Sequence, residues 1–284
     1  MDVSSVANNA TLSQKIWNFK GKVDYVDGWF LMSTPFQLLF ITSFYLLFVL
    51  KVGPGYMKNR SAFKLTNVLI LYNAIQVLYS LYLSIVGTTI IYANGLLCPS
   101  CLMETKESRY LITSSTYLYF FAKFTELMDT MFFVLRKKDN QVTFLHVYHH
   151  TLMLWSTWLT LKYEPSYSLV FLGTINSFVH VIMYAYYGLS AFPEMEKYLW
   201  WKKYITRMQL TQFVMILVHA LANLKYSGCP PSNTLMLTIV LNVFLFLYLF
   251  GKFYVTCYIK SKGKEAKCKN NNNVQHHEKY AKLN

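Results

Sequence analysis

Charged side chains are scarce in this sequence: they make up 14% of its 284 residues, whereas hydrophobic residues make up 54%. A soluble domain of this size needs more polar surface, so the composition excludes an ordinary soluble protein and indicates a polytopic membrane protein. Acidic residues are rarer than basic ones, with 13 Asp and Glu against 27 Lys and Arg. We expect this excess to set the membrane orientation and to offer an anion site, and we expect no nucleic-acid partner.

Cysteine is also rare, and five residues do not make a disulfide scaffold. The segment Cys98-Pro-Ser-Cys101 has the spacing of a zinc or redox pair, but no second pair accompanies it. We expect instead a bridge from Cys229 to Cys98 or to Cys101, formed in an oxidising compartment. A basic segment followed by an apolar core is missing after Met1, so we expect no removable signal peptide.

Seven apolar stretches are long enough to cross about 30 Å of hydrocarbon. They are 35–50, 65–86, 113–135, 144–162, 167–190, 204–224 and 234–257. Together they predict one all-α membrane domain over 35–258 with seven transmembrane helices. Residues 1–34 precede it as an interfacial segment with a glycosylation sequon at Asn9. The Lys- and Asn-rich residues 259–284 are too polar to pack, so we expect a disordered tail.

Basic residues are divided unevenly between the two sides of the expected bundle. Nineteen Lys and Arg fall in 51–64, in 136–143, in 191–207 and after 251, against seven on the opposite side. Basic residues concentrate in cytoplasmic loops. The count therefore predicts an extracytoplasmic N-terminus and a cytosolic C-terminus, as an odd number of helices requires.

The fourth stretch carries three imidazoles within five residues, at His146, His149 and His150. Ionisable groups cost free energy inside a bilayer and by default indicate a function. At 100° per residue, the three side chains lie within about one third of the helix circumference, so they can point into one cavity. We therefore predict that this cluster carries the chemistry.

Further polar residues occur in three other stretches. Counting about 1.5 Å per residue from the basic side places Asp129, His180, Gln209 and Gln212 in one layer with His149. The polar residues of the three stretches are Lys123, Glu126 and Asp129 in the third stretch, Asn176, His180, Tyr184 and Tyr187 in the fifth, and Gln209 and Gln212 in the sixth. A structural ion pair, a hydrogen-bonded stripe and interhelical contacts are the respective alternatives. His219 lies deeper, so we expect a structural role for it.

Six basic residues surround the cytosolic side of this layer and could hold phosphate groups. They are Arg136, Lys137, Lys138, Lys202, Lys203 and Arg207. Setting the topology or contacting lipid headgroups is the alternative for each. A polar layer that opens to a basic rim, with an apolar interior able to receive a hydrocarbon chain, indicates a reaction centre.

Four ordered motifs carry a family resemblance. They are Lys123-x-x-Glu126-x-x-Asp129-Thr130, His146-x-x-His149-His150, His180-x-x-Met183-Tyr184-x-Tyr186-Tyr187 and Thr206-x-x-Gln209-x-x-Gln212-Phe213. In this order and spacing they resemble the ELO family of very-long-chain fatty acid elongases, from about Pro35 to about Tyr258. The resemblance implies a barrel-like bundle around an acyl-chain tunnel, built from six of seven helices. It also implies an endoplasmic reticulum membrane location, a luminal N-terminus, and a luminal staple between Cys98 or Cys101 and Cys229.

The resemblance implies a reaction as well, that of a condensing enzyme or 3-oxoacyl-CoA synthase. Such an acyltransferase joins a long-chain acyl-CoA to malonyl-CoA, releases carbon dioxide and CoA, and lengthens the chain by two carbons. Implied partners are membrane lipid, the two CoA substrates, a second copy of the chain, and the reductases and dehydratase of the elongation cycle. No cofactor and no metal is expected.

No cysteine lies in the polar layer, so we hypothesise that the imidazole of His149 attacks the acyl thioester. His146 and His150, oriented by Asp129 or Glu126, would fix its tautomer and take the proton. The enolate oxygen of malonyl-CoA would be stabilised by His180, Asn176 or Gln212. The alternative role for Lys123 is to neutralise Glu126 and Asp129.

Two other functions fit parts of the pattern. A membrane di-iron desaturase or hydroxylase shares the HxxHH motif, but its iron needs more histidines than the five in the membrane part. A seven-helix receptor or channel would change conformation without turnover and does not explain a buried triple histidine. Metal analysis tests the first alternative, and carbon dioxide release from malonyl-CoA tests the second.

Overall fold

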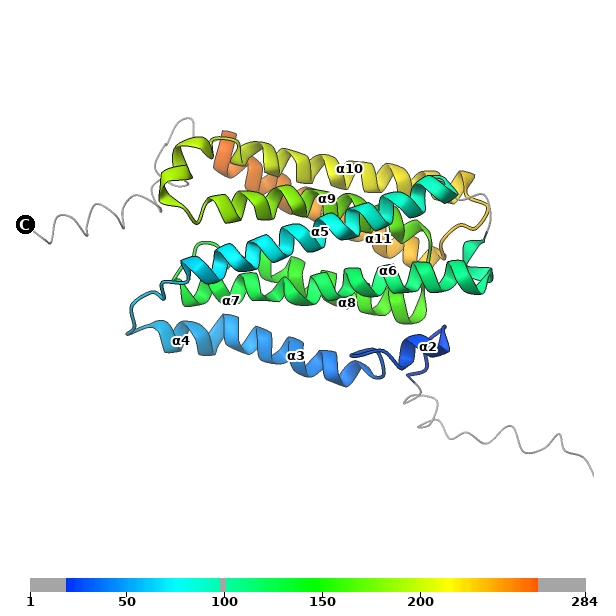
Figure 1. The fold of residues 1–284 in the computed structure, drawn as a ribbon, viewed down its shortest axis with the longest axis horizontal. Helices are drawn as coiled ribbons and strands as arrows, with labels where there is room; N and C mark the ends of the chain where they lie inside the picture. The colour runs from blue at the N-terminus through cyan, green and yellow to red at the C-terminus, as the bar shows by residue number, and fades with distance from the viewer. Residues whose placement is uncertain (1–18, 98–100, 260–284) are drawn as a thin grey trace, which may run out of the picture.

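The computed structural model describes residues 19–97 and 101–259 (Figure 1). Within these residues the chain contains helices and no β-strand, so the predicted all-α class is confirmed. The sequon at Asn9, the thiol of Cys98 and the tail beyond residue 259 lie outside the described residues.

Most helices are long and lie roughly along one axis (Figure 1). Two 3₁₀-helical turns, η3 and η4, and two π-helical turns, η2 and η5, complete the chain order. The elements are α2 (Asp24–Asp27), α3 (Pro35–Leu47), η2 (Phe48–Val52), α4 (Gly53–Met57), α5 (Thr66–Asn94), η3 (Leu102–Glu104), α6 (Lys106–Thr125), α7 (Leu127–Leu135), α8 (Phe144–Tyr163), α9 (Ser168–Leu189), η4 (Pro193–Tyr198), α10 (Lys202–Tyr226), α11 (Asn233–Tyr254) and η5 (Val255–Ile259).

Five helical segments of the described chain are long and apolar enough to cross a membrane. They are Pro35–Met57, Thr66–Asn94, Ser168–Leu189, Lys202–Tyr226 and Asn233–Ile259. The protein is therefore a polytopic membrane protein. The segments α6–α7 and α8 are not among the five, and they carry the charged residues and the three histidines of the predicted site. Each of the seven predicted stretches overlaps one long helical segment, and the count of seven transmembrane helices stays a prediction.

The first helical segment is longer than the sequence indicated. We expected it to end near 50, but η2 and α4 extend the helical segment to Met57. Pro54 stands in the first turn of α4, directly after the π-helical turn η2. Gly53 is needed for packing, because a Cβ there would lie 2.7 Å from Cγ1 of Val134 on α7.

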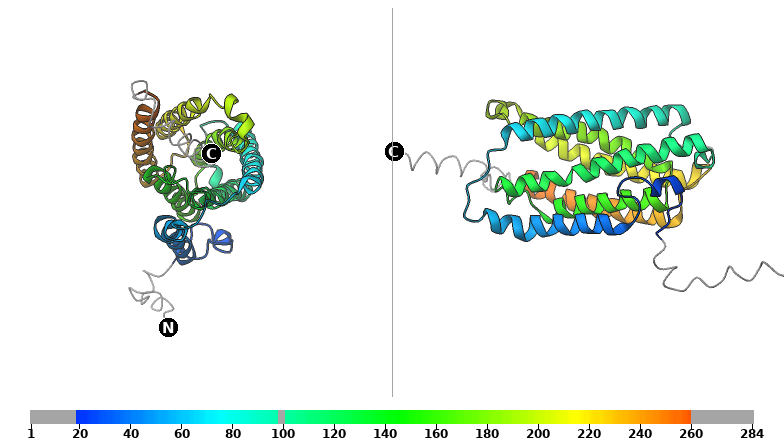
Figure 2. Two further views of the ribbon diagram at one scale, coloured as in Figure 1. Left: turned by 90° about the vertical axis from the view of Figure 1, so that its left-hand side faces the viewer. Right: turned by 60° about the horizontal axis from the view of Figure 1, so that its bottom comes forward.

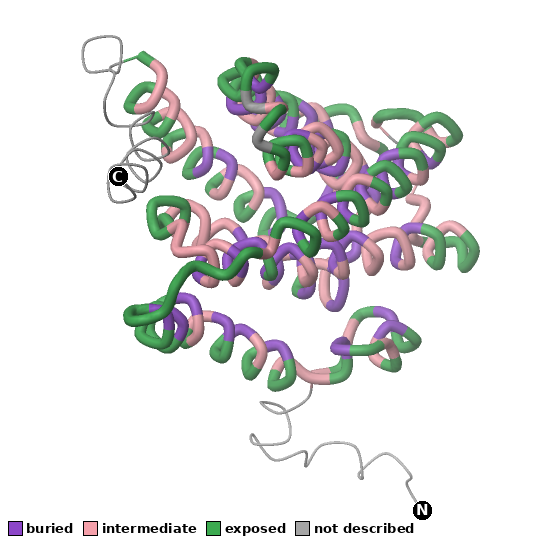
Figure 3. Tube along the Cα trace, turned by 60° about the vertical axis from the view of Figure 1, so that its left-hand side comes forward, coloured by how far each residue is buried: buried purple, intermediate pink, exposed green. Residues whose placement is uncertain are grey.

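The long helices surround a common interior. Around it, α5, α9, α10, α11, α8 and α6 contact one another in turn and return to α5, as the end-on view shows (Figure 2, left). The helix pair α3 and α4 lies outside this ring (Figure 2), where Tyr45 and Leu38 pack with Phe120 and Leu154. Outward faces are exposed along most helices (Figure 3) and carry large apolar side chains such as Phe40 and Leu78.

Residues 19–34 are packed against α8. Val26 and Met32 are fully buried, and the ammonium of Lys162 lies 2.6 Å from Oδ1 of Asp27. The indole of Trp158 donates a 2.7 Å hydrogen bond to the carbonyl of Leu31. A buried cation and a buried indole thus attach this segment to the bundle.

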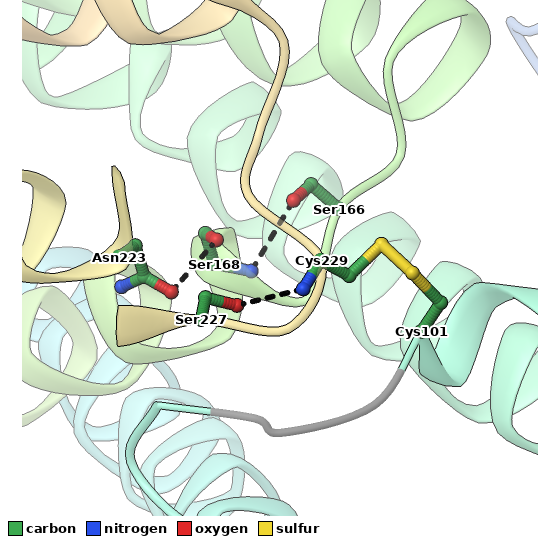
Figure 4. Close-up of a disulfide and its surroundings, with 6 residues drawn as sticks. All are labelled: Cys101, Ser166, Ser168, Asn223, Ser227 and Cys229. Carbon is green, nitrogen blue, oxygen red and sulfur yellow. Dashed lines mark hydrogen bonds between the residues drawn. A yellow bond between two sulfur atoms is a disulfide. The ribbon is translucent and has the colours of Figure 1, made fainter. Parts of the chain in front are cut away.

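The two ends of the bundle differ in character. We call the end with the connections 58–65, 136–143 and 190–201 the basic end, and the end with 95–97, 101–105, 164–167 and 227–232 the disulfide end. At the disulfide end, Cys101 is bonded to Cys229 (Figure 4). Of the two predicted pairings, the structure thus contains the one with Cys101.

Candidate active site

A buried ion pair occupies the break between α6 and α7. The ammonium of Lys123 donates to both carboxylate oxygens of Glu126, at 2.8 and 3.1 Å. Each side chain is only 2% exposed. Glu126 is the single residue between the two helices. Lys123 and Glu126 therefore form the direct ion pair that was the alternative interpretation of this stretch.

Two residues of α9 complete this cluster. Oδ1 of Asn176 accepts hydrogen bonds from Lys123 Nζ at 2.8 Å and from the hydroxyl of Tyr119 at 2.7 Å. Nδ1 of His180 lies 3.1 Å from Oε1 of Glu126, although the ring is not oriented for a hydrogen bond. Asn176 and His180 are four residues apart, so one face of α9 presents both to the ion pair.

Asp129 belongs to a different contact. Its Oδ2 accepts a 2.7 Å hydrogen bond from the hydroxyl of Tyr184. No salt bridge joins Asp129 to Lys123 within the described chain. The prediction that Lys123 neutralises both carboxylates is therefore correct for direct pairing with Glu126 only, because α7 starts after the break and turns Asp129 toward α9.

The three histidines lie together, as their spacing predicted. The ring centroids of His146 and His150 are 4.3 Å apart, and those of His149 and His150 are 5.4 Å apart. The helix that carries them starts just before, since Thr143 Oγ1 caps it by accepting from the backbone N–H of His146. Nε2 of His146 is buried and has no hydrogen-bond partner among the described residues.

A mostly apolar cavity extends from the histidines toward the disulfide end. Near the site its wall is formed by His149, Tyr119, Asn176, Gln212 and Phe246. At its far end the wall is formed by Thr160, Leu169, Val170 and Leu235. Thr160 follows His149 by eleven positions on α8, which corresponds to about 16 Å along the helix axis. The cavity is thus elongated, with one histidine of the cluster on its wall.

The remaining predicted contacts are more scattered. Gln212 is 3% exposed, and its Oε1 has no partner among the described residues. Gln209 donates to the sulfur of Met183 at 3.7 Å, and it does not line the cavity. Tyr187 is exposed. His219 lies toward the disulfide end, with Nε2 3.1 Å from the carbonyl oxygen of Leu96.

The six predicted basic residues lie at the basic end, in two groups. Arg136, Lys137 and Lys138 follow α7, and Lys202, Lys203 and Arg207 fall in the first turns of α10. Nε of Arg207 donates to the hydroxyl of Tyr254 at 2.6 Å. Partial burial lowers the pKa of Arg136, although its guanidinium stays protonated at neutral pH.

Sequence reasoning missed Tyr119, Tyr72 and Gln76. Tyr119 lies one turn before Lys123 on the same helix face, and that spacing was the available signal. Tyr72 donates to the carbonyl of Thr125, and Gln76 donates to its hydroxyl. These two bonds from α5 hold the end of α6 next to the break.

Across residues 19–97 and 101–259, no group of three or more His, Cys, Asp or Glu side chains is placed to hold a metal ion. Glu126 pairs with Lys123, and Asp129 accepts from Tyr184. The polar groups of the site are thus directed at one another and at the cavity.

Comparison with known proteins gives the family. The model of the ELO, or GNS1/SUR4, family matches residues 30–266. The chain is 38% identical over 272 residues to very long chain fatty acid elongase 4 of Homo sapiens, covering 94% of this chain and 85% of the relative. It is 40% identical to elongase 7 of Drosophila melanogaster, covering 89% and 78%, and 42% identical to elongase 2 of Mus musculus, covering 83% and 80%. The match spans every helix of the site, and the chain therefore belongs to the ELO family of fatty acid elongases.

Proposed function

We propose that this protein is the condensing enzyme of very-long-chain fatty acid elongation, a 3-oxoacyl-CoA synthase. It joins an acyl-CoA to malonyl-CoA and releases carbon dioxide and CoA. The observation that carries the proposal is the position of His149 on the wall of an elongated apolar cavity, beside a buried polar cluster. The cavity suits an acyl chain, and the polar end suits its thioester.

In the first step, an imidazole nitrogen of His149 attacks the carbonyl carbon of the acyl thioester. A carbon–nitrogen bond forms, the carbon–sulfur bond breaks, and CoA leaves as a thiolate that takes one proton. His150, whose ring adjoins that of His149, accepts the imidazole proton, and His146 adjoins His150 in turn. The low polarity of the cavity protects the acyl-imidazole from water.

In the second step, malonyl-CoA loses carbon dioxide, and the electrons of the broken carbon–carbon bond form an enolate. The enolate carbon attacks the acyl carbonyl and expels the imidazole. The product is the 3-oxoacyl-CoA, two carbons longer than the acyl substrate, and one proton is consumed overall. The reaction needs no redox partner, because no atom is oxidised by an external group.

The surroundings of the site fit substrates that carry phosphates. Arg136 and Lys202 stand at the basic end, and with their neighbours they would contact the CoA phosphates. We further propose a location in the endoplasmic reticulum membrane with a luminal disulfide end. The enzymes that reduce and dehydrate the product are the expected partners, and a homodimer is the expected assembly.

The test is carbon dioxide release from carboxyl-labelled malonyl-CoA. Purified, metal-chelated protein is given a saturated long-chain acyl-CoA, and wild type is compared with His149→Ala. We expect release by wild type and loss of it in the variant. His219→Ala is the matched control, because His219 is a buried histidine outside the cavity wall.

A second readout follows the acyl-enzyme. Without malonyl-CoA, wild type should release one CoA thiol per site and gain the mass of the acyl group, whereas His149→Ala should do neither. Folded wild type that releases no carbon dioxide with several acyl chain lengths would overturn the proposal. Carbon dioxide release that persists in His149→Ala would show that His149 is not the nucleophile.

A further inference from the structure

The amide of Asn176 is held in one orientation by two donors. Lys123 Nζ and the hydroxyl of Tyr119 lie 2.8 and 2.7 Å from the same atom, Oδ1. An ammonium can only donate, so the atom that faces Lys123 must be the amide oxygen. If the amide were flipped, its NH2 group would face the ammonium of Lys123, and two donors would oppose each other. The nitrogen Nδ2 is therefore fixed on the other side of the side chain.

That nitrogen has no acceptor. Among the described residues, no atom accepts a hydrogen bond from Nδ2 of Asn176. Asn176 is 7% exposed and lines the same cavity wall as His149. Nδ2 is not among the fully enclosed side-chain atoms that lack a partner in the described chain, so it keeps some accessible surface at the cavity wall. A donor that faces a cavity without a protein acceptor is available to an acceptor atom of a ligand.

Lys123 itself has no N–H left to donate to a ligand. Its ammonium has three N–H groups, and all three are used, by the two oxygens of Glu126 and by Oδ1 of Asn176. Its side chain is 2% exposed. The charge of Lys123 therefore acts on the cavity through the amide of Asn176, which it polarises.

We propose that Nδ2 of Asn176 is the hydrogen-bond donor to the acyl carbonyl oxygen during condensation, and that Lys123 and Tyr119 are positioning residues. The inference rests on the proposed function. When the imidazole bonds to the carbonyl carbon, the carbon–oxygen π electrons move onto oxygen, and Nδ2–H stabilises that oxyanion. Collapse restores the carbonyl and expels the thiolate. The same donor acts again when the enolate attacks and the imidazole leaves.

The first test is Asn176→Asp. This change keeps the oxygen that accepts from Lys123 and Tyr119 and replaces the donor nitrogen with a second oxygen. We expect kcat for carbon dioxide release to fall about 10²–10³-fold, with little change in KM for acyl-CoA. CoA release without malonyl-CoA should slow by a similar factor, because the oxyanion forms in that step too. Asn176→Ala should behave alike.

The matched control is Asn73→Ala. Asn73 is also a buried asparagine on a long helix, but its Nδ2 donates to the carbonyl of Leu69 on its own helix, and it does not line the cavity. This variant should keep the wild-type kcat. If Asn176→Ala does not fold, Asn176→Asp, which has nearly the same shape, still decides the question.

The positioning role is tested by non-additivity. In a Lys123→Met, Glu126→Gln double variant, which leaves no unpaired buried charge, kcat should fall and KM should not. Adding Asn176→Ala to that background should then cost less than about twofold, since the amide is already unanchored. Tyr119→Phe should lower kcat by about two- to tenfold, because one of two anchoring bonds remains.

The outcomes separate the two proposals. Wild type that releases no carbon dioxide would contradict the proposed function. An active wild type with a folded, fully active Asn176→Asp variant would overturn the oxyanion role alone. Losses that multiply fully when the Lys123 and Asn176 changes are combined would show that Lys123 acts independently of the amide.

Discussion

The hydroxyl of Tyr184 donates a 2.7 Å hydrogen bond to Oδ2 of Asp129 and so joins α9 to α7. Both side chains are buried. A buried carboxylate that loses a donor is destabilised by about 1–3 kcal/mol. We therefore expect Tyr184→Phe to lower the unfolding temperature in detergent, as measured by intrinsic fluorescence. Tyr187→Phe is the control, because Tyr187 is exposed on the same helix; equal stability of the two variants would contradict the prediction.

Lys162 should be a main support of the segment before α3. Its ammonium donates to Asp27 Oδ1 and to the backbone carbonyls of Met32 and Ser33. Lys162→Met removes all three bonds and leaves Asp27 without its cation, which costs about 3 kcal/mol for a largely buried pair. A thermal unfolding series should show this loss, with partial recovery in the Lys162→Met, Asp27→Leu double variant.

The control for that series is the exposed pair of Lys20 and Asp24, which lies 3.1 Å apart. Exposed pairs contribute little, so Lys20→Met should change stability by less than about 1 kcal/mol. If Lys162→Met were equally mild, the segment would be held by its apolar contacts instead.

The bond between Cys101 and Cys229 predicts that Cys98 is not needed for the bridge. Cys101 and Cys229 are 128 residues apart in the chain, so the bridge restricts a long stretch of the unfolded chain and should stabilise the fold by about 2–5 kcal/mol. Maleimide labelling should show an intact bridge in Cys98→Ser and a free Cys229 in Cys101→Ser. The opposite pattern would show that Cys98 is the partner.

The size of the side chain at position 173 should limit how long an acyl chain fits, and Gly173 leaves the space open. It lines the cavity three residues from Asn176 toward the disulfide end, and the three atoms nearest to a Cβ there belong to the ring of Tyr119, the nearest at 3.8 Å. Gly173→Val would place methyl groups in the path of the chain. We expect kcat/KM to fall about tenfold or more for long acyl-CoA and less for short acyl-CoA.

Gly251→Val is the control for Gly173, because a Cβ at Gly251 on α11 meets nothing within 4 Å and the residue does not line the cavity. Its chain-length profile should match wild type. An equal loss for every chain length in Gly173→Val would argue against a limit at this position and for a general distortion of α9.

Several features of the protein could be predicted because they depend on nearby residues in one helix. The apolar stretches follow from hydropathy, and the shared face of His146, His149 and His150 follows from the helical repeat. The pairing of Lys123 with Glu126 follows from a spacing of three. The sequence by itself therefore determined the helical membrane class, the shared face of the three histidines and the contact of Lys123 with Glu126.

Other features were decided only by the tertiary structure, because they depend on how helices distant in the sequence pack and rotate. The neighbours α5 and α9 are separated in the chain by α6, α7 and α8. Asp129 faces Tyr184, because the helix is interrupted at Glu126 between α6 and α7. The anchoring of Asn176 by Tyr119 and Lys123 joins α9 to α6. Spacing within one helix cannot specify a contact between two, since that contact is fixed by the packing of all the side chains around it.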